Sequence, residues 1–417
     1  MARLCLTGSG DWPRIVSVFE PDYQAVFPSR GRSFSAELSE GLDLLLARVD
    51  GKRDRILVVT FFAATDGNRN FGVKKRAAAG LLSRTGIRAP WSFVAQPPAP
   101  PSRVSLYAET IPSGARAFLR RRHWGGFPYG VIESGPDRIL FAAGLTGGLR
   151  PRDMAGRSRA ALDAAGRILA RESLSAGDIV RQWNYLEAII DVRASRTGPR
   201  QNYQEFNDSR RDFYSRAAFP AGYPAATGIG ARDGGVSVDF RALAPRRGLR
   251  IVPLSNPLQK DAHRYSQNVL VGGDAADGPA KSAPLFERAK FVGDGSAGLV
   301  YISGTAAIRD QSTAGAGDAA AQTRITIENI HRLVSAGNLR RHGIAVRDDT
   351  GPPAYLRAYV RRGRDLGAVR AACRLAFGDI PSHFVRAAIC RDDLLVEIEG
   401  IVRVKLEKTR GKEGASR

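Results

Sequence analysis

DRILFAAG (residues 137–144) and GLVYISG (298–304) open two stretches of the chain that follow one pattern. Each begins with an apolar run that ends in small residues, as a β-strand before a turn does. Each is followed by a segment with apolar residues at helical spacing and then by a second apolar run. These following segments are RSRAALDAAGRILA (157–170) and GDIVRQWNYLEAIID (177–191) in the first half, and QTRITIENIHRLVSAG (322–337) and AYLRAYVRR (354–362) in the second. The sequence therefore predicts a strand, helix, strand unit that occurs twice.

The second half continues with a predicted helix, DLGAVRAACRLAFG (365–378), and a closing strand, LLVEIEGIVRV (394–404). Aliphatic and acidic residues alternate along this strand, so Glu397 and Glu399 share one face of it. Prolines, arginines and turn residues gather at 241–259, which predicts a module boundary that divides the chain into 1–245 and 246–417. We expect a surface loop at 271–284 and a stiff, proline-rich connector near Pro97.

Composition describes a globular protein, with 43% hydrophobic and 25% charged residues among 417. The sequence has no apolar run long enough to span a bilayer and no secretory leader, so we expect a cytoplasmic protein without a membrane partner. Its three cysteines include no C-x-x-C pair. The formal net charge is +22, but the basic residues are spread along the chain. We therefore expect no specific nucleic-acid partner and a positive field that favours a small dianion.

Several blocks resemble the chorismatases, which are two-module relatives of the RidA (YjgF) superfamily. They occur in the family's order within about 201–402: QNYQEFNDSRRDFY (201–214), YPAATGIGA (223–231), SNPLQ (255–259), APLFERAKFV (283–292), SGTAAI (303–308) and AICRDDLLVEIEG (388–400). The resemblance implies an α+β fold of two RidA/YjgF-like (chorismate mutase-like) modules, with mixed sheets and helices packed on one side. Residues 1 to about 130 match only loosely.

The resemblance also implies an activity, the cleavage of chorismate to pyruvate and a ring product without metal or organic cofactor. Depending on the subfamily, the ring product is 3-hydroxybenzoate, 4-hydroxybenzoate or a dihydroxycyclohexadienoate. The chain departs from the family at the loop that ends in KSAPLFERA (281–289) and at the IRDQST turn (308–313). These departures keep open a RidA-like hydrolase or deaminase on another small anion. A non-enzymatic anion- or nucleic-acid-binding protein is the third alternative.

Glu397 resembles the family's catalytic glutamate, and a shielded carboxylic acid suits protonation of an enol ether because burial raises its pKa. Glu399 is its neighbour on the same face and the rival candidate. Cys390 precedes Glu397 by seven residues, at a position where the resemblance links cysteine to 3-hydroxybenzoate formation. A buried thiol is also an ordinary packing residue.

Chorismate carries two carboxylates, for which arginines are natural partners. Arg288 is the first candidate by resemblance, and Arg361 and Arg370 are further candidates among 63 lysines and arginines. Tyr203 is expected to donate its hydroxyl to substrate or to serve as a half-buried aromatic. The small residues Gly304, Thr305 and Ala306 are expected to line the pocket wall.

Other catalytic patterns are missing from the sequence, which has no H-E-x-x-H, Walker loop, G-x-S-x-G or G-x-G-x-x-G before a helix. The five histidines lack the spacing of metal ligands. RidA proteins are trimers with sites between subunits, while a fused chain supplies such contacts internally. We therefore expect a monomer, with a trimer as the alternative.

Overall fold

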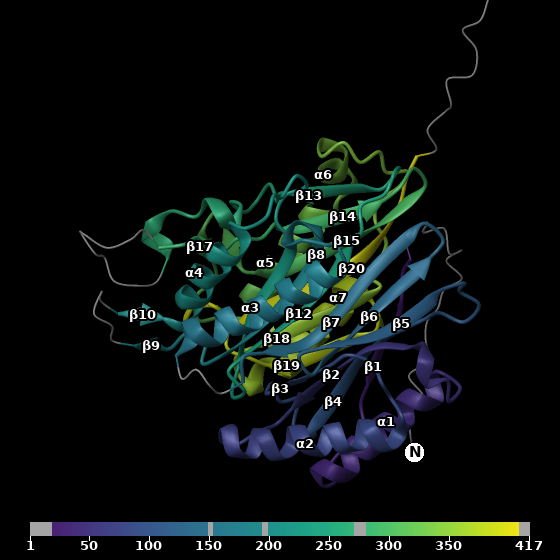
Figure 1. Ribbon diagram of the computed structural model, residues 1–417. Helices are drawn as coiled ribbons and strands as arrows, with labels where there is room; N and C mark the ends of the chain where they lie inside the picture. Colours follow the sequence, from purple (N-terminus) through teal and green to yellow (C-terminus); the bar gives the residue numbers. More distant parts are fainter. Residues whose placement is uncertain (1–18, 149–152, 194–198, 271–280, 408–417) are drawn as a thin grey trace, which may run out of the picture.

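Three mixed β-sheets, each with helices on one face, make up the protein (Figure 1). The computed structural model describes residues 19–148, 153–193, 199–270 and 281–407. The first sheet has four strands, β1 (Asp22–Val26), β2 (Ile56–Ala63), β3 (Trp91–Val94) and β4 (Val104–Thr110). Its helices are α1 (Phe34–Arg48) and α2 (Gly67–Thr85), which lie at the bottom of Figure 1.

The second and third sheets have six strands each. The second contains β5 (Phe118–Trp124), β6 (Phe127–Ser134), β7 (Asp137–Thr146), β8 (Ile179–Glu187), β11 (Ala225–Ala231) and β12 (Val236–Leu243), with helices α3 (Met154–Arg171) and α4 (Asn202–Tyr214). The third contains β13 (Arg250–Leu254), β14 (Ala289–Gly293), β15 (Ala297–Ala306), β18 (Tyr355–Val360), β19 (Ser382–Arg386) and β20 (Val396–Lys405), with α5 (Ala319–Val334), α6 (Ala336–Arg341) and α7 (Leu366–Phe377).

Short elements complete the described chain. They are the two-residue strands β9 (Val192–Arg193), β10 (Arg200–Gln201), β16 (Ile308–Arg309) and β17 (Ser312–Thr313), and 3₁₀ turns at Arg53–Arg55, Ala176–Asp178, Ala262–Arg264, Gln267–Val269 and Gly363–Asp365. None of the helices among the described residues is both long enough and apolar enough to cross a membrane.

The two six-stranded sheets have the same topology. The strand order is β11-β8-β12-β7-β6-β5 in one and β19-β18-β20-β15-β14-β13 in the other. Each sheet has one parallel pair of strands: β8 and β11, which flank α4, and β18 and β19, which flank α7. The other neighbouring strands are antiparallel. The predicted repeat is confirmed in this order of elements, and so is the α+β class with mixed sheets.

The first sheet adds a third copy that the sequence pattern did not indicate. Its order, β3-β2-β4-β1, matches β11-β8-β12-β7, and β2 and β3 are its parallel pair. Among the described residues, this sheet has no counterparts of the hairpin strands β5 and β6. Strand β2, ILVVTFFA, is buried along its whole length, so it shows no alternation from which a half-exposed strand could be recognised.

The apolar core lies on both sides of the six-stranded sheets. One cluster fills the space under α3 and α4 of the second sheet, and a second fills the space under α5 and α7 of the third. A larger cluster draws residues from all three sheets, among them Phe61, Phe141 and Tyr301. The sheet faces without helices therefore pack against one another, and a small pocket between them is lined by Tyr107, Asp239 and Arg357 among others.

Capping side chains fix where the long helices begin. Asp153 accepts a hydrogen bond from the amide of Gly156 at the start of α3, and Asp318 accepts from the amides of Ala320 and Ala321 at the start of α5. These bonds satisfy amides that have no partner inside the helix. The two helices are thereby set at equivalent places in the repeat.

The predicted boundary at 245/246 falls in the connection between β12 and β13. The division into modules that fold independently stays a prediction. Residues 271–280 of the predicted surface loop lie outside the described residues. The proline-rich segment runs beside β19, where the amide of Arg386 donates to the carbonyl of Pro97 at 2.8 Å.

Candidate active site

A cavity that opens to solvent lies where the second sheet meets the third, and its space, open solvent included, is about 680 Å³. Helix α4 and strand β11 contribute Tyr203 and Gly228 on one side. The third sheet and the loop before β20 contribute Arg288, Cys390 and Glu397 on the other. Residues from both halves of one chain therefore form the walls.

Among the described residues that line this cavity, Glu397 is the only acidic one. Its side chain is 4% exposed, and it makes no hydrogen bond or ion pair with any residue that the structure describes. Burial, and next the negative charge of Glu399, raise the pKa of Glu397 to about 8, against a smaller opposing effect of Arg181 and Arg288. The group is therefore a neutral carboxylic acid near pH 7, with a proton to donate.

A β-bulge beside Glu397 explains the glycine of the SGTA segment. The pairing of β15 with β20 shifts register between Ile302 and Thr305, which leaves Gly304 opposite the carboxyl group. A Cβ on Gly304 would lie 2.0 Å from Oε1 of Glu397. Only glycine therefore leaves room for the acid at this place.

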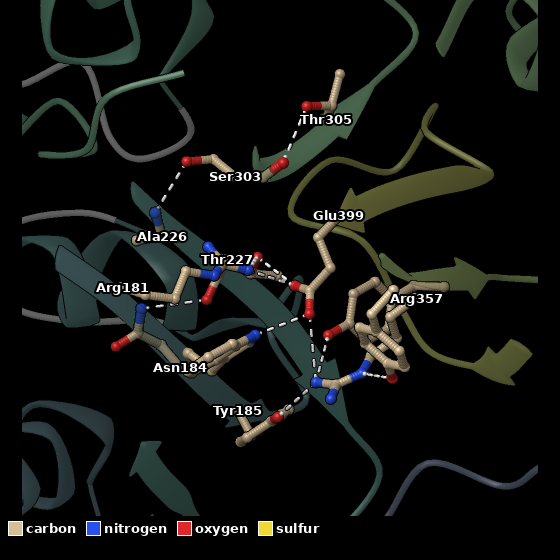
Figure 2. A network of polar contacts seen from close by, with 12 residues as sticks. Arg181, Asn184, Tyr185, Ala226, Thr227, Ser303, Thr305, Arg357 and Glu399 are labelled. Atoms are coloured by element: carbon tan, nitrogen blue, oxygen red, sulfur yellow. Dashed lines mark hydrogen bonds and ion pairs between the residues drawn. The ribbon is translucent and has the colours of Figure 1, made fainter. Parts of the chain in front are cut away.

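Glu399 points into the interface between the two sheets and not into the cavity (Figure 2). Its Oε2 accepts from Arg181 at 2.7 Å and from Thr227 at 2.5 Å, and its Oε1 accepts from Trp183 at 2.8 Å. Arg357 forms a second ion pair with Oε1, at 3.3 Å. Burial alone raises the pKa of Glu399, but the two arginines and these hydrogen bonds outweigh it and lower the pKa. Glu399 is therefore a fixed, fully paired anion.

Tyr203 and Cys390 lie together at the cavity wall near Glu397. Gly228 makes room for the phenol, since a Cβ there would lie 2.8 Å from the Tyr203 ring. Burial first, and then the neighbouring Cys390, raise the pKa of Tyr203. Burial raises the pKa of Cys390 to about 12, so the sulfur is a thiol and not a thiolate at neutral pH.

The structure brings together only some of the residues expected from the sequence. Arg288, Tyr203, Gly304, Ala306, Cys390 and Glu397 line the cavity. The Thr305 hydroxyl instead donates to the Ser303 carbonyl at 2.9 Å. Arg361 pairs with Asp392 at 3.0 Å, and Arg370 is exposed on α7. Neither arginine lines the cavity, because no described residue of β18 or α7 reaches its wall.

Comparison with known proteins shows the fold of the chain and a family match to part of its sequence. Residues 137–244 match the model of the family "Chorismatase FkbO/Hyg5-like, N-terminal". A crystal structure of a chorismatase, 23% identical, has a TM-score of 0.64 and covers 93% of this chain and 100% of its own. Over residues 137–244 the chain is therefore similar to the chorismatase family. The resemblance read from the sequence blocks is thereby confirmed.

Two curated relatives of this family come from Streptomyces hygroscopicus. One is named 3-hydroxybenzoate synthase and is 36% identical over 237 residues, which are 55% of this chain and 65% of that protein. The other is named chorismatase and is 35% identical over 226 residues, which are 54% of this chain and 61% of that protein. The matches thus span less than two thirds of either relative.

The cavity also contains residues that the sequence did not single out. Gln204 and Asn207 line the cavity from α4, as Tyr203 does. Asn207 lies one helical turn after Tyr203 and Gln204, so helical spacing within QNYQEFN was a usable signal. Tyr265 and Arg391 line the opposite side. Arg391 follows Cys390 directly, so its position in the AICRDD block was a usable signal. Among the described residues, no group of three or more His, Cys, Asp or Glu could hold a metal ion.

We expect Gly304→Ala to destabilise the protein by about 1–3 kcal/mol, because its methyl group would overlap the Glu397 carboxyl. Denaturant unfolding measures this free energy. Gly337→Ala is the matched control, since a Cβ there meets nothing within 4 Å and its effect should be near zero or stabilising.

A double-mutant cycle isolates the overlap. In a Glu397→Ala background the added methyl has room, so the cost of Gly304→Ala should fall. An equal cost in both backgrounds would mean that Gly304 is required for a reason other than the acid.

Proposed function

We propose that this protein cleaves the enolpyruvyl ether of chorismate to pyruvate and a hydroxybenzoate, with 3-hydroxybenzoate as the favoured product. The observation that carries the proposal is the protonated Glu397 in a cavity beside Arg288 and Cys390. The names of the two curated relatives support it. The protein is an enzyme in this proposal, it acts on a small molecule in the cytoplasm, and its own residues supply the acid.

The chemistry begins with a proton. Glu397 delivers it to the methylene carbon or the ether oxygen of the enolpyruvyl group, and the cation that develops is stabilised by attached oxygen. Pyruvate and a hydroxybenzoate together have the composition of chorismate, so this route consumes no water. The bond between the ring carbon and the ether oxygen then breaks, which releases pyruvate and leaves the positive charge on the ring. The Glu397 carboxylate accepts the proton that the ring loses when it becomes aromatic, which restores the acid.

Glu399 keeps Glu397 in its working state. The negative charge of Glu399 opposes ionisation of the Glu397 carboxyl. The two carboxyl groups therefore have pKa values that are shifted in opposite directions. Glu399 itself cannot share the proton, because two arginines, a threonine and a tryptophan hold it ionised.

Cys390 is the residue that we propose to direct the ring product. Its thiol lies at the cavity wall beside Tyr203 and Glu397 and is neutral, so it excludes water and contacts the ring without adding charge. The hydrolytic outcome requires water at the ring intermediate. A small apolar thiol in its place favours rearrangement.

Incubation with chorismate, followed by chromatography of pyruvate and aromatic acids, tests the proposed function directly. Release of neither product by the folded protein would overturn it and favour another small anion as substrate. Tight, sequence-independent DNA binding at physiological salt would favour the nucleic-acid alternative.

Glu397→Gln is expected to reduce pyruvate release by about 10²- to 10⁴-fold, because the amide is nearly isosteric with the acid but has no proton to give. An unchanged thermal transition is the control for folding. Near-normal turnover would remove Glu397 from the mechanism.

Cys390→Ala should leave pyruvate release in place but shift the ring product toward a dihydroxycyclohexadienoate, because the vacated space admits water. Product ratios by chromatography measure the shift. An unchanged ratio would assign Cys390 a packing role only.

The pH profile follows from the raised pKa of Glu397. The acid form works below its pKa, so kcat/KM should fall above about pH 8 as the group ionises. Glu399→Gln removes the neighbouring negative charge, lowers the pKa of Glu397 and should move this alkaline limb to lower pH. A limb that stays in place would show that Glu399 does not control the protonation of Glu397.

A further inference from the structure

The IRDQST turn (308–313), where the sequence departs from the chorismatases, adjoins the cavity wall. Strands β16 and β17 pair across it and leave Asp310 and Gln311 at its tip. Ile308 lines the cavity, whereas Asp310 and Gln311 do not. The tip of the turn therefore acts on the cavity only through the residues that it contacts.

Gln311 makes two hydrogen bonds, each to a different segment of that wall. Its side-chain Oε1 accepts from the amide of Ser266 at 3.0 Å, and its main-chain carbonyl accepts from Nη1 of Arg391 at 2.7 Å. Arg391 lines the cavity, and so does Tyr265, which directly precedes Ser266. One residue outside the cavity therefore holds two residues that line it.

The two residues held in this way also contact each other. The guanidinium carbon of Arg391 lies 5.1 Å from the centre of the Tyr265 ring, which is within the range of a cation–π interaction. Such a contact weakens when either the ring or the cation is displaced. Its geometry therefore depends on Gln311 at both ends.

Main-chain bonds join the same turn to the start of the Tyr265 segment. The Asp310 amide donates to the Leu258 carbonyl at 2.9 Å, and the Lys260 amide donates to the Asp310 carbonyl at 2.8 Å. These two bonds use no side-chain atom. The bond beside Tyr265 is different, because its acceptor is the side-chain amide oxygen of Gln311.

We propose that Gln311 is a positioning residue that sets how tightly the cavity holds its substrate, because it aligns Tyr265 with Arg391. It takes no part in proton transfer, since it is not among the described residues that line the cavity. The inference rests on the proposed function, and it gives a role to a turn in which the chain departs from the chorismatases.

Gln311→Ala removes the acceptor for the Ser266 amide and keeps the carbonyl that binds Arg391. KM for chorismate should rise about 2- to 10-fold, the range for loss of one hydrogen bond between uncharged groups, while kcat changes by less than about twofold. The alkaline limb of the pH profile should stay in place, because Glu397 is unchanged. Ser312→Ala, at an exposed position of the same turn, is the matched control and should leave KM and kcat unchanged.

A second variant removes the same bond from its donor side. Ser266 has a φ of −69° and Tyr265 before it a ψ of 139°, so the backbone there already fits a proline at 266. Ser266→Pro has no amide hydrogen to donate and should raise KM by a similar factor. In the double variant with Gln311→Ala the increase should match that of either single variant, because both changes remove one bond. Additive increases would overturn the role of this bond.

The outcomes distinguish this inference from the proposed function. Wild-type protein that releases no pyruvate from chorismate overturns the function, and titration calorimetry with 3-hydroxybenzoate then tests the positioning. A weaker Kd in Gln311→Ala supports it, and an equal Kd, or no binding to either protein, overturns it. Normal wild-type turnover with an unchanged KM in Gln311→Ala, or with a fall in kcat or in the thermal transition instead, overturns the inference alone.

Discussion

The ion cluster around Glu399 is the interaction on which the site depends. Its two arginines come from different sheets, Arg181 from β8 and Arg357 from β18, and Thr227 of β11 completes the cluster (Figure 2). Removing one member would leave a buried charge without its partner, which costs several kcal/mol, so the cluster holds the two sheets in one arrangement. The same arrangement brings Tyr203 and Gly228 of the second sheet against Glu397 of the third. Glu399 thus has two effects: it joins the sheets, and its charge adds to the effect of burial in raising the pKa of Glu397.

The sequence was sufficient to predict the repeat and the shared strand face of Glu397 and Glu399, but not the residues that contact them. Alternation along β20 correctly places Glu397 and Glu399 on one face, because period two follows from strand geometry. What covers that face depends on Arg181, 218 positions away from Glu399, and no local pattern reports a contact of that separation. The opposite roles of the two glutamates follow from such distant partners. The arginines show the same limit: residue type nominated Arg361, but its side chain turns to Asp392, and the neighbour of Cys390 lines the cavity instead.

The first sheet, which is the third copy of the repeat, adds two junctions that can be compared with the cavity. Three units with one strand order create three comparable junctions inside a single chain. At the junction of the first and second sheets, Gly144 occupies the place of Gly304, but a Cβ there would lie 2.3 Å from the carbonyl oxygen of Trp91. Backbone therefore fills the space that Glu397 and substrate would need. At the junction of the third and first sheets, aromatic rings occupy the interior, with His383 packed 5.4 Å from Phe62.

The junctions between the three sheets therefore differ in what they contain. The pocket between the first sheet and the other two contains Arg241 and Arg357, which pair with Glu109 and Glu399. The cavity between the second and third sheets instead contains arginines that have no carboxylate partner among the described residues. Such a cavity is unfavourable by itself, because Arg288 and a protonated Glu397 are held away from water. Packing at the other junctions and the interactions of the Glu399 cluster stabilise the fold and offset this cost. An anion that enters the cavity can pair with its arginines. In the proposed reaction, the proton of Glu397 then lies beside the ether bond that breaks.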